Sequence, residues 1–165
     1  MIELYEGVPG SGKSYHAISE KFLPWVKQGR RLYIAVDGIY LDRLALFTGI
    51  ELCVLEQQIT LWKDSVEVLQ AFPHVEPGSA VIIDEAQTVF RSMQKVEPGL
   101  LRWLETHRHY GVDILLMSQD FRQMSQGVTR LIEATVKFRK LAFVGLAKKY
   151  QGKVRGNPED HEVIR

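Results

Sequence analysis

The sequence predicts an α/β fold of three layers, with helices on both faces of a mostly parallel sheet of about five strands. Short segments that are apolar throughout alternate along the chain with segments whose apolar residues recur at helical spacing. The length of 165 residues, with 45% hydrophobic and 25% charged residues, is typical of a soluble globular domain. No repeat or internal linker interrupts the pattern. We therefore expect residues 1–165 to form a single domain.

The first half of the chain carries three predicted strands and three predicted helices. The strands are apolar segments: residues 2–6, residues 31–36 and, more weakly, residues 51–55. The helices have apolar residues at helical spacing: residues 13–28, 41–47 and 62–72. Because proline lacks an N–H group, we expect Pro24 to kink or end the first helix and Pro73 to stop the third.

The second half continues the alternation. Strands are predicted at residues 80–83, at residues 112–117 and near Val136. Helices are predicted in two places: from residues 97–99 to Gly111, and from about Thr129. We expect the first strand to be central and the strand at 112–117 to separate it from the strand at 80–83. The chain then continues into a basic, hairpin-like segment.

Cysteine content and hydropathy exclude several classes of protein. Cys53 is the single cysteine, so no internal disulfide can form; we expect a reducing compartment and a small buried side chain at this position. Residues 1–6 lack the basic flank and long apolar core of a signal peptide. No apolar run approaches the ~20 residues that span a bilayer. We expect this chain by itself to be soluble and cytoplasmic.

Positive charge is concentrated in one segment, although the net charge is only +1. Residues 137–155 contain seven basic residues and no acidic one, which leaves 14 basic and 20 acidic residues elsewhere. The segment suits the anionic headgroups of a membrane, or single-stranded DNA, because Phe138, Phe143 and Tyr150 are interleaved with the cations. It is equally typical of a solvated hairpin whose lysines discourage edge pairing.

A glycine-rich segment between the first strand and the first helix gives the strongest chemical signal. Two of its glycines are separated by four residues and followed by lysine and serine: Gly7-Val8-Pro9-Gly10-Ser11-Gly12-Lys13-Ser14. Glycines let the backbone curl around an anion with its amides directed inward, and the helix that follows presents free N–H groups to phosphate. The segment predicts a P-loop NTPase that binds ATP, with Lys13 at the β- and γ-phosphates and Ser14 at Mg²⁺.

Polar side chains at the ends of two later strands complete the predicted site. Asp84 follows the apolar strand at 80–83 and is expected to hold Mg²⁺ at the carboxyl edge of the sheet. Glu85 is placed to activate the attacking water. Gln119 ends the strand at 112–117 and is our candidate for contact with the γ-phosphate or that water, with Ser118 second. These predictions define the additional-strand, catalytic-glutamate type of P-loop fold.

An arginine is often needed as charge builds on the γ-phosphate. Arg108 and Arg122 flank the strand that ends at Gln119 and are the preferred candidates. Either could instead serve a neighbouring subunit, or form a surface ion pair.

These motifs together resemble a known family, the amino-terminal ATPase domain of zonula occludens toxin-like proteins, which are the gene I assembly proteins of filamentous phages. The resemblance rests on four segments and covers most of the chain: residues 2–14, 82–87 (Ile-Ile-Asp-Glu-Ala-Gln), 105–109 (Glu-Thr-His-Arg-His) and 113–119.

The resemblance implies an ATPase that powers virion assembly and extrusion at the host inner membrane. It implies a homo-oligomer, with a hexamer as one form, and contacts with phage assembly and coat proteins and with phage single-stranded DNA. Membrane-spanning and periplasmic parts of the family are missing from this sequence. We therefore expect the cytoplasmic portion, at the inner face of the membrane in an intact protein.

Two other functions share the same nucleotide chemistry and stay open. One is a DNA helicase or packaging motor, which stimulation by single-stranded DNA would indicate. The other is a nucleotide switch that does not hydrolyse ATP, which an enzyme assay would separate from both motors.

Overall fold

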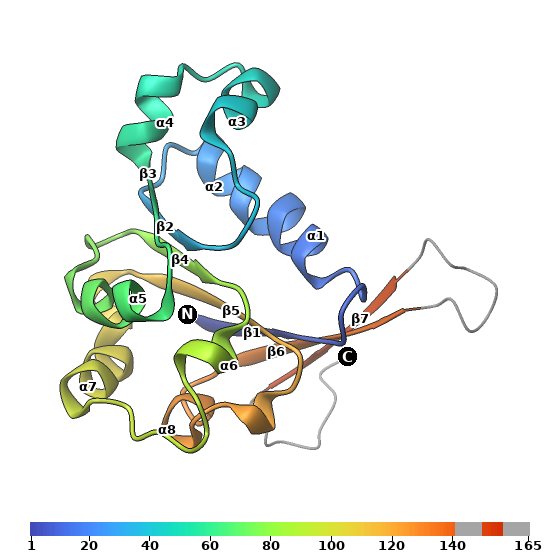
Figure 1. Ribbon diagram of the computed structural model, residues 1–165, viewed down its shortest axis with the longest axis vertical. Helices are drawn as coiled ribbons and strands as arrows, with labels where there is room; N and C mark the ends of the chain where they lie inside the picture. Colours follow the sequence, from blue (N-terminus) through green and yellow to red (C-terminus); the bar gives the residue numbers. More distant parts are fainter. Residues whose placement is uncertain (141–149, 157–165) are drawn as a thin grey trace.

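The computed structural model describes residues 1–140 and 150–156, and at its centre is a seven-stranded sheet (Figure 1). The strand order is β3-β2-β4-β5-β1-β6-β7, and all neighbouring pairs are parallel except β6 and β7. The strands are β1 (Ile2–Glu6), β2 (Leu32–Ala35), β3 (Ile59–Leu61), β4 (Ala80–Ile83), β5 (Asp113–Ser118), β6 (Ala134–Lys140) and β7 (Tyr150–Arg155). The predicted class is confirmed, but the sheet has seven strands rather than about five, because β3 at one edge and β7 at the other extend it.

The order of the central strands is as predicted. Strand β5 lies between β1 and β4, with Ile114 in register with Ile2 on one side and with Val81 on the other. Because parallel strands end at the same edge, this order brings the segments that follow β1, β4 and β5 together.

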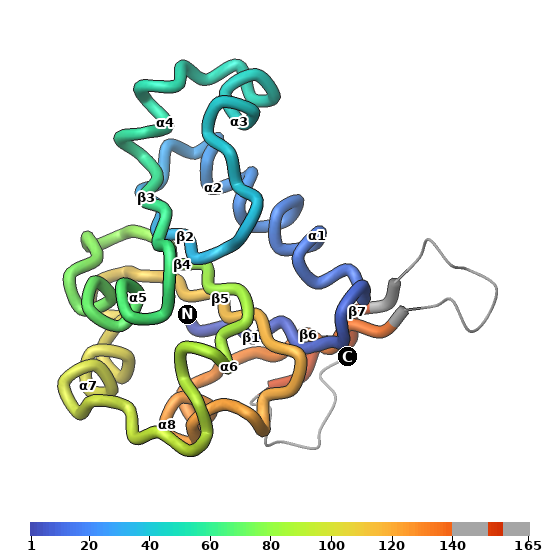
Figure 2. Tube along the Cα trace, viewed as in Figure 1, coloured from blue at the N-terminus to red at the C-terminus, as the bar shows by residue number. Residues whose placement is uncertain are grey.

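Helices cover both faces of the sheet (Figures 1 and 2). They are α1 (Lys13–Ala17), α2 (Leu23–Lys27), α3 (Leu41–Thr48), α4 (Leu52–Gln58), α5 (Ser65–Ala71), α6 (Ala86–Val89), α7 (Pro98–Thr106) and α8 (Gln126–Thr129). Helices α1 to α4 pack on the face that buries Tyr5, Ile82 and Met117. Helices α5 to α8 pack on the opposite face, where Leu4 and Ile83 lie.

The prediction of a strand at 51–55 is wrong, because residues 52–55 belong to helix α4. Leu55 is fully buried, whereas the residues at 52–54 are exposed, Cys53 included, so the expectation of a buried cysteine is also wrong. The helix aligns Leu55 with Gln58, whose Nε2 donates to the carbonyl oxygens of Val26 and Arg30 at 2.9 Å. These tertiary contacts outweigh the local preference of a short apolar segment for the extended conformation.

Three helix boundaries also differ from the prediction. A π-helical turn (Ile18–Phe22) joins α1 to α2, so the helix does not end at Pro24; the proline lies in the first turn of α2, where its missing N–H is not needed. Helix α5 begins only after Asp64, whose carboxylate accepts the N–H groups of Val66 and Glu67 at 2.9 Å. The last helix, α8, ends at Thr129 instead of beginning there.

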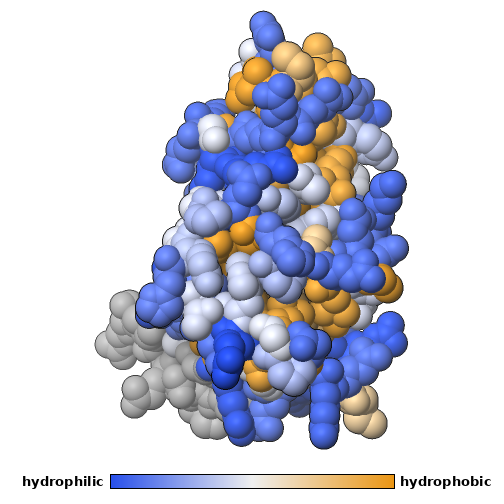
Figure 3. Space-filling view, turned by 90° about the vertical axis from the view of Figure 1, so that its left-hand side faces the viewer, coloured by the Kyte–Doolittle hydropathy of each residue, from blue (hydrophilic) through white to orange (hydrophobic). Residues whose placement is uncertain are grey.

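Hydrophobic side chains gather on the surface at the end of the molecule formed by α3 and α4 (Figure 3). Leu46 and Phe47 of α3 are 88% and 70% exposed, and Val54 of α4 is 47% exposed. Exposed apolar groups in such a cluster are typical of a contact surface. Within residues 1–140 and 150–156, no helix combines the length and the apolar character needed to cross a bilayer.

Candidate nucleotide site

The loop between β1 and α1 has the backbone that its glycines predict. Gly10 and Gly12 have φ values of 71° and 95°, a region in which a side chain would be strained. The N–H of Ser11 donates to the carbonyl oxygen of Val8 at 3.1 Å, which curls the loop. Val8, Pro9 and Gly10 are exposed at its crest. The loop is therefore open to a ligand above the sheet edge.

Gly7 is required for a different reason, the close approach of strand β6. A Cβ at this position would lie 2.9 Å from the carbonyl oxygen of Phe138 and 2.5 Å from Oγ of Ser11. The N–H of Gly7 donates to the carbonyl oxygen of Ser118 at 3.1 Å, so the loop is also tied to the end of β5. The position of the loop depends on the absence of a side chain at Gly7.

We expect Gly7→Ala to destabilise the fold by about 1–3 kcal/mol, because the backbone oxygen of Phe138 cannot move aside as a flexible side chain would. Urea unfolding followed by circular dichroism measures the change. Gly127→Ala is the matched control, since its nearest neighbour would be a leucine methyl at 3.4 Å. Equal stability of the two variants would show that the approach of β6 does not constrain Gly7.

Two polar side chains of the loop are buried without full partners. Lys13 is only 6% exposed, and its Nζ lies 4.0 Å from Oε1 of Glu85. Oγ of Ser11 is buried and has no hydrogen-bond partner among the described residues. A buried ammonium and an unmet hydroxyl beside inward-curled backbone suit an anionic ligand.

Ser14 and Asp84 meet as predicted. The Oγ of Ser14 donates to Oδ2 of Asp84 at 3.3 Å, and Oδ1 of Asp84 accepts the N–H of Glu85 at 2.8 Å. A hydroxyl and a carboxylate are hard oxygen ligands, which Mg²⁺ prefers, and it takes few protein ligands when phosphates and water supply the rest. No group of three or more His, Cys, Asp or Glu among the described residues could hold a metal by itself. The pair therefore fits Mg²⁺ bound with nucleotide.

Glu85 has an unusual backbone and three polar neighbours. Its φ of 47° is the single positive value at a non-glycine position in the described chain. Glu85 takes this conformation as the N-cap residue of α6. Besides Lys13, the carboxylate contacts two amides: Nε2 of Gln119 at 3.1 and 3.3 Å, and Nε2 of Gln87. A cavity of about 300 Å³ adjoins the side of Glu85, lined also by Asp37 and Trp62.

The structure thus brings Gln119 to Glu85 at the site. It also brings Gln87 there, a residue to which the sequence assigned no role of its own. Helix α6 is four residues long and was not predicted, so nothing indicated that Gln87 turns back toward Glu85. Its spacing, two residues after Glu85 at a strand end, was the only available signal.

The two candidate arginines lie at opposite edges of the sheet. Arg122 is at the carboxyl edge, 78% exposed, and binds Asp120 through three contacts of 2.7 to 3.1 Å. Hydrogen bonds from Arg122 outweigh the opposing effect of burial and lower the pKa of Asp120. Arg108 contacts Glu133 next to Ile2, one strand length (roughly 15 Å) from the loop at residues 7–14. The prediction that Arg108 adjoins the nucleotide of its own chain is wrong, because the turn before β5 lies at the amino edge.

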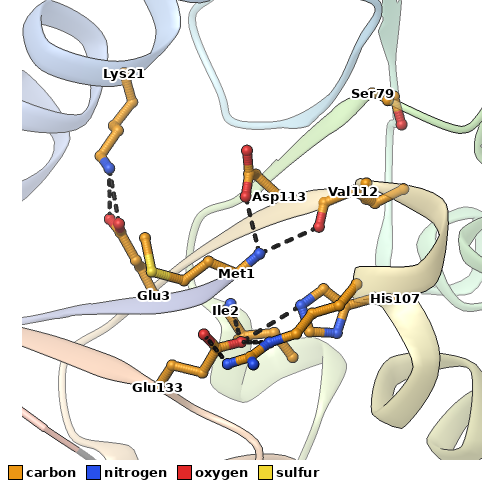
Figure 4. Close-up of polar contacts among 12 residues, drawn as sticks. Met1, Ile2, Glu3, Lys21, Ser79, His107, Val112, Asp113 and Glu133 are labelled. Carbon is orange, nitrogen blue, oxygen red and sulfur yellow. Dashed lines mark hydrogen bonds and ion pairs between the residues drawn. The ribbon is translucent and has the colours of Figure 1, made fainter.

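Glu133, the partner of Arg108, belongs to a polar network at that amino edge, together with Met1 and Asp113 (Figure 4). The α-amino group of Met1 lies 2.8 Å from Oδ1 of Asp113, and Nη1 of Arg30 lies 2.7 Å from Oδ2. Glu133 accepts the N–H of Ile2 at 3.2 Å. Burial opposes ionisation of Asp113, but the hydrogen bonds from the amino group and Arg30 outweigh it and lower its pKa. The network holds the starts of β1, β5 and β6 together.

This network predicts a loss of stability in acid. Because the pKa of Asp113 is lower in the folded chain than in the unfolded one, its contribution is complete above about pH 4 and disappears as the pH falls through the folded value. We expect Asp113→Asn to be less stable than the wild type at neutral pH, with the difference shrinking below about pH 4. Thermal unfolding between pH 3 and pH 7 measures it. A difference that is constant with pH would contradict the assigned ion pair.

Comparisons with known proteins agree in family and fold. The family model described as Zonular occludens toxin (Zot) matches residues 1–165. The Gene 1 protein of Xanthomonas phage phiLf is 27% identical over 164 residues, which are 92% of this chain and 37% of that protein. ORF301 of Pseudomonas phage Pf3, described as an assembly protein, is 27% identical over 168 residues, which are 98% of this chain and 50% of that protein. The chain thus spans half or less of the length of these relatives.

Solved structures show the same fold at lower identity. The N-terminal domain of zonular occludens toxin from Neisseria meningitidis superposes with a TM-score of 0.58 and 20% identity, covering 96% of this chain and 94% of that one. The genome packaging NTPase B204 from Sulfolobus turreted icosahedral virus 2, solved with ATPγS, superposes with a TM-score of 0.60 and 21% identity, covering 90% and 80%.

Proposed function

The chain belongs to the zonular occludens toxin family, and from that membership we propose that it binds and hydrolyses ATP to power filamentous phage assembly and extrusion. The description of the Pf3 relative as an assembly protein supports the assembly role, and the phiLf relative is likewise a phage protein. The observation that carries the enzymatic part is the convergence of Lys13, Ser14, Asp84, Glu85 and Gln119, from three separate segments, at one edge of the sheet.

ATP is proposed to lie along the loop at residues 7–14, with its phosphates against the backbone amides. Lys13 loses little hydration by binding them, since it is already buried. Ser14 and Asp84 would hold Mg²⁺, which neutralises charge on the β- and γ-phosphates when bound. This part of the proposal is supported by the similarity of the fold to that of B204, which was solved with ATPγS bound.

Hydrolysis requires a base near the γ-phosphate, and Glu85 is the residue proposed for that role. In the proposed step, the water oxygen forms a bond to the γ-phosphorus and the bond from phosphorus to the bridging oxygen breaks. ADP leaves with the electron pair, and the carboxylate of Glu85 takes the proton of the water. Gln119 donates to that carboxylate, and its proposed second role is contact with the water or the γ-phosphate.

Phosphate release is the test of this proposal. We expect steady release from ATP with Mg²⁺ and none above background when EDTA replaces the metal. Nucleotide binding without turnover under any condition would instead indicate the nucleotide switch. A rate that rises strongly with single-stranded DNA would favour the packaging or helicase type of motor. The fold of this chain is similar to that of one packaging enzyme, the NTPase B204.

A homo-oligomer, with a hexamer as one form, is proposed by analogy with related motors. Arg108 of the same chain contacts Glu133 at the amino edge and does not reach the site. Arg122 is exposed near the carboxyl edge and is the remaining preferred donor, either in its own chain or toward a neighbouring copy. Light scattering with ATPγS and Mg²⁺, compared with the nucleotide-free chain, would detect the assembly.

The basic hairpin of β6 and β7 is proposed as the contact with an anionic membrane surface at the cytoplasmic face of the inner membrane. Lys137 lies opposite Lys153 in the antiparallel pair, so the two cations share one face, where like charges repel unless an anion is near. Glu6 offsets part of this charge, with Oε2 at 3.2 Å from Nζ of Lys137. Arg139 is exposed on the same strand.

Phe138 of the hairpin is not available for base stacking, which differs from the expectation drawn from the sequence. Phe138 is 2% exposed and packs against the rings of Tyr5 and His16 at 5.2 Å, so it is closed to a nucleobase; that part of the DNA interpretation is wrong. Phe143, Lys148 and Lys149 lie outside the described residues. Phage single-stranded DNA is kept as the alternative ligand of the same cations, and phage assembly and coat proteins as proposed partners.

A further inference from the structure

The carboxylate of Glu85 is held by two amide side chains from different parts of the fold. Nε2 of Gln119, just after β5, donates to both carboxylate oxygens, at 3.1 and 3.3 Å. Nε2 of Gln87, in α6, donates to Oε2. The side chain of Glu85 is 42% exposed, so without these donors it would be free to turn into solvent. Its orientation therefore depends on the two glutamines.

Gln87 is fixed in place by the short helix that carries it. Ala86 and Val89 of α6 are buried in the core, at 0% and 6% exposed. The N–H and Oγ1 of Thr88 donate to the carbonyl oxygen of Glu85 at 2.7 and 2.9 Å, which closes the turn around that residue. Helix α6 thus anchors Gln87 beside the carboxylate on rigid backbone.

The other end of the Gln87 amide argues against a purely structural role. Its Oε1 is buried and has no hydrogen-bond partner among the described residues. A glutamine that served only to stabilise the fold would be expected to satisfy its buried oxygen, because an unmet buried acceptor is unfavourable. The reverse orientation would bring that oxygen against a carboxylate oxygen. The amide is therefore oriented by Glu85.

We propose that Gln87 is a positioning residue, which together with Gln119 holds the Glu85 carboxylate in the orientation that accepts a proton from the attacking water. This inference rests on the proposed hydrolysis of ATP at this site. Gln87 does not touch the reacting atoms in this proposal. It acts through Glu85, whereas Lys13 and Gln119 are the proposed contacts of the phosphates.

The variant Gln87→Met tests the proposal, since methionine is close to glutamine in shape but cannot donate. We expect kcat to fall about tenfold through lost orientation, with KM for ATP and the affinity for ATPγS unchanged. Gln57→Met, at an exposed position in α4, is the matched control and should keep the wild-type kcat. Thermal unfolding of both variants checks that they fold.

A double-mutant cycle separates positioning from general stability. If Gln87 acts through Glu85, adding Gln87→Met to Glu85→Gln should cause no further loss of kcat, because the base is already absent. The same tenfold loss in both backgrounds, or a Gln87→Met variant with wild-type kcat, would overturn the inference while leaving hydrolysis established. A wild-type chain that binds ATP but never releases phosphate would overturn both.

Discussion

Replacing Glu85 with glutamine is expected to lower ATP turnover by at least about a hundredfold and to leave ATP binding intact. The substitution removes the base but keeps the length of the side chain. ATP binding should persist because, in the proposed mechanism, Glu85 acts on the attacking water and does not bind the phosphates directly. Phosphate release gives the turnover, and equilibrium titration with a fluorescent ATP analogue gives the affinity.

The control for this variant is Glu56→Gln, at an exposed position in α4. It removes the same charge without touching the site and should turn over ATP at the wild-type rate. Undiminished turnover in Glu85→Gln would remove Glu85 from the mechanism, whatever its contacts.

Lys13→Ala is expected to weaken ATP binding by on the order of a hundredfold, because a buried charge-assisted contact with phosphate is lost. The side chain of Lys13 is almost fully buried, and its Nζ lies 4.0 Å from Oε1 of Glu85. This loose pairing leaves its hydrogen-bonding capacity available for the ligand.

Titration calorimetry of the Lys13→Ala variant with ATP and Mg²⁺ measures the loss. Lys27→Ala, an exposed lysine at the end of α2, is the control and should bind as the wild type does. Wild-type affinity in Lys13→Ala would mean that the loop does not hold the phosphates through this side chain.

The parts of the fold that were predictable are those dictated by local chemistry. Gly10 and Gly12 adopt the positive φ that their place in the loop requires, and the apolar segment at 80–83 is a strand buried throughout. The meeting of Glu85 with Gln119 followed from the rule that parallel strands end at one edge. Such features can be inferred from a single sequence because each depends on few residues.

The parts that were not predictable depend on distant contacts. Helix α4 forms because Leu55 and Gln58 find partners on the segment near Val26, which no local pattern reveals. Arg108 was assigned to the wrong edge because its segment turns back to meet Glu133 before β5 begins. Gln87 was missed because its role depends on a four-residue helix that returns its side chain to Glu85.

The most direct measurement of the central claim is isothermal titration calorimetry of the wild-type chain with ATPγS in the presence of Mg²⁺. The arrangement of the loop, Ser14 and Asp84 predicts saturable heat at one site per chain, reduced when EDTA replaces the metal. No heat of association with any adenine nucleotide would contradict the site from which the proposed function is drawn.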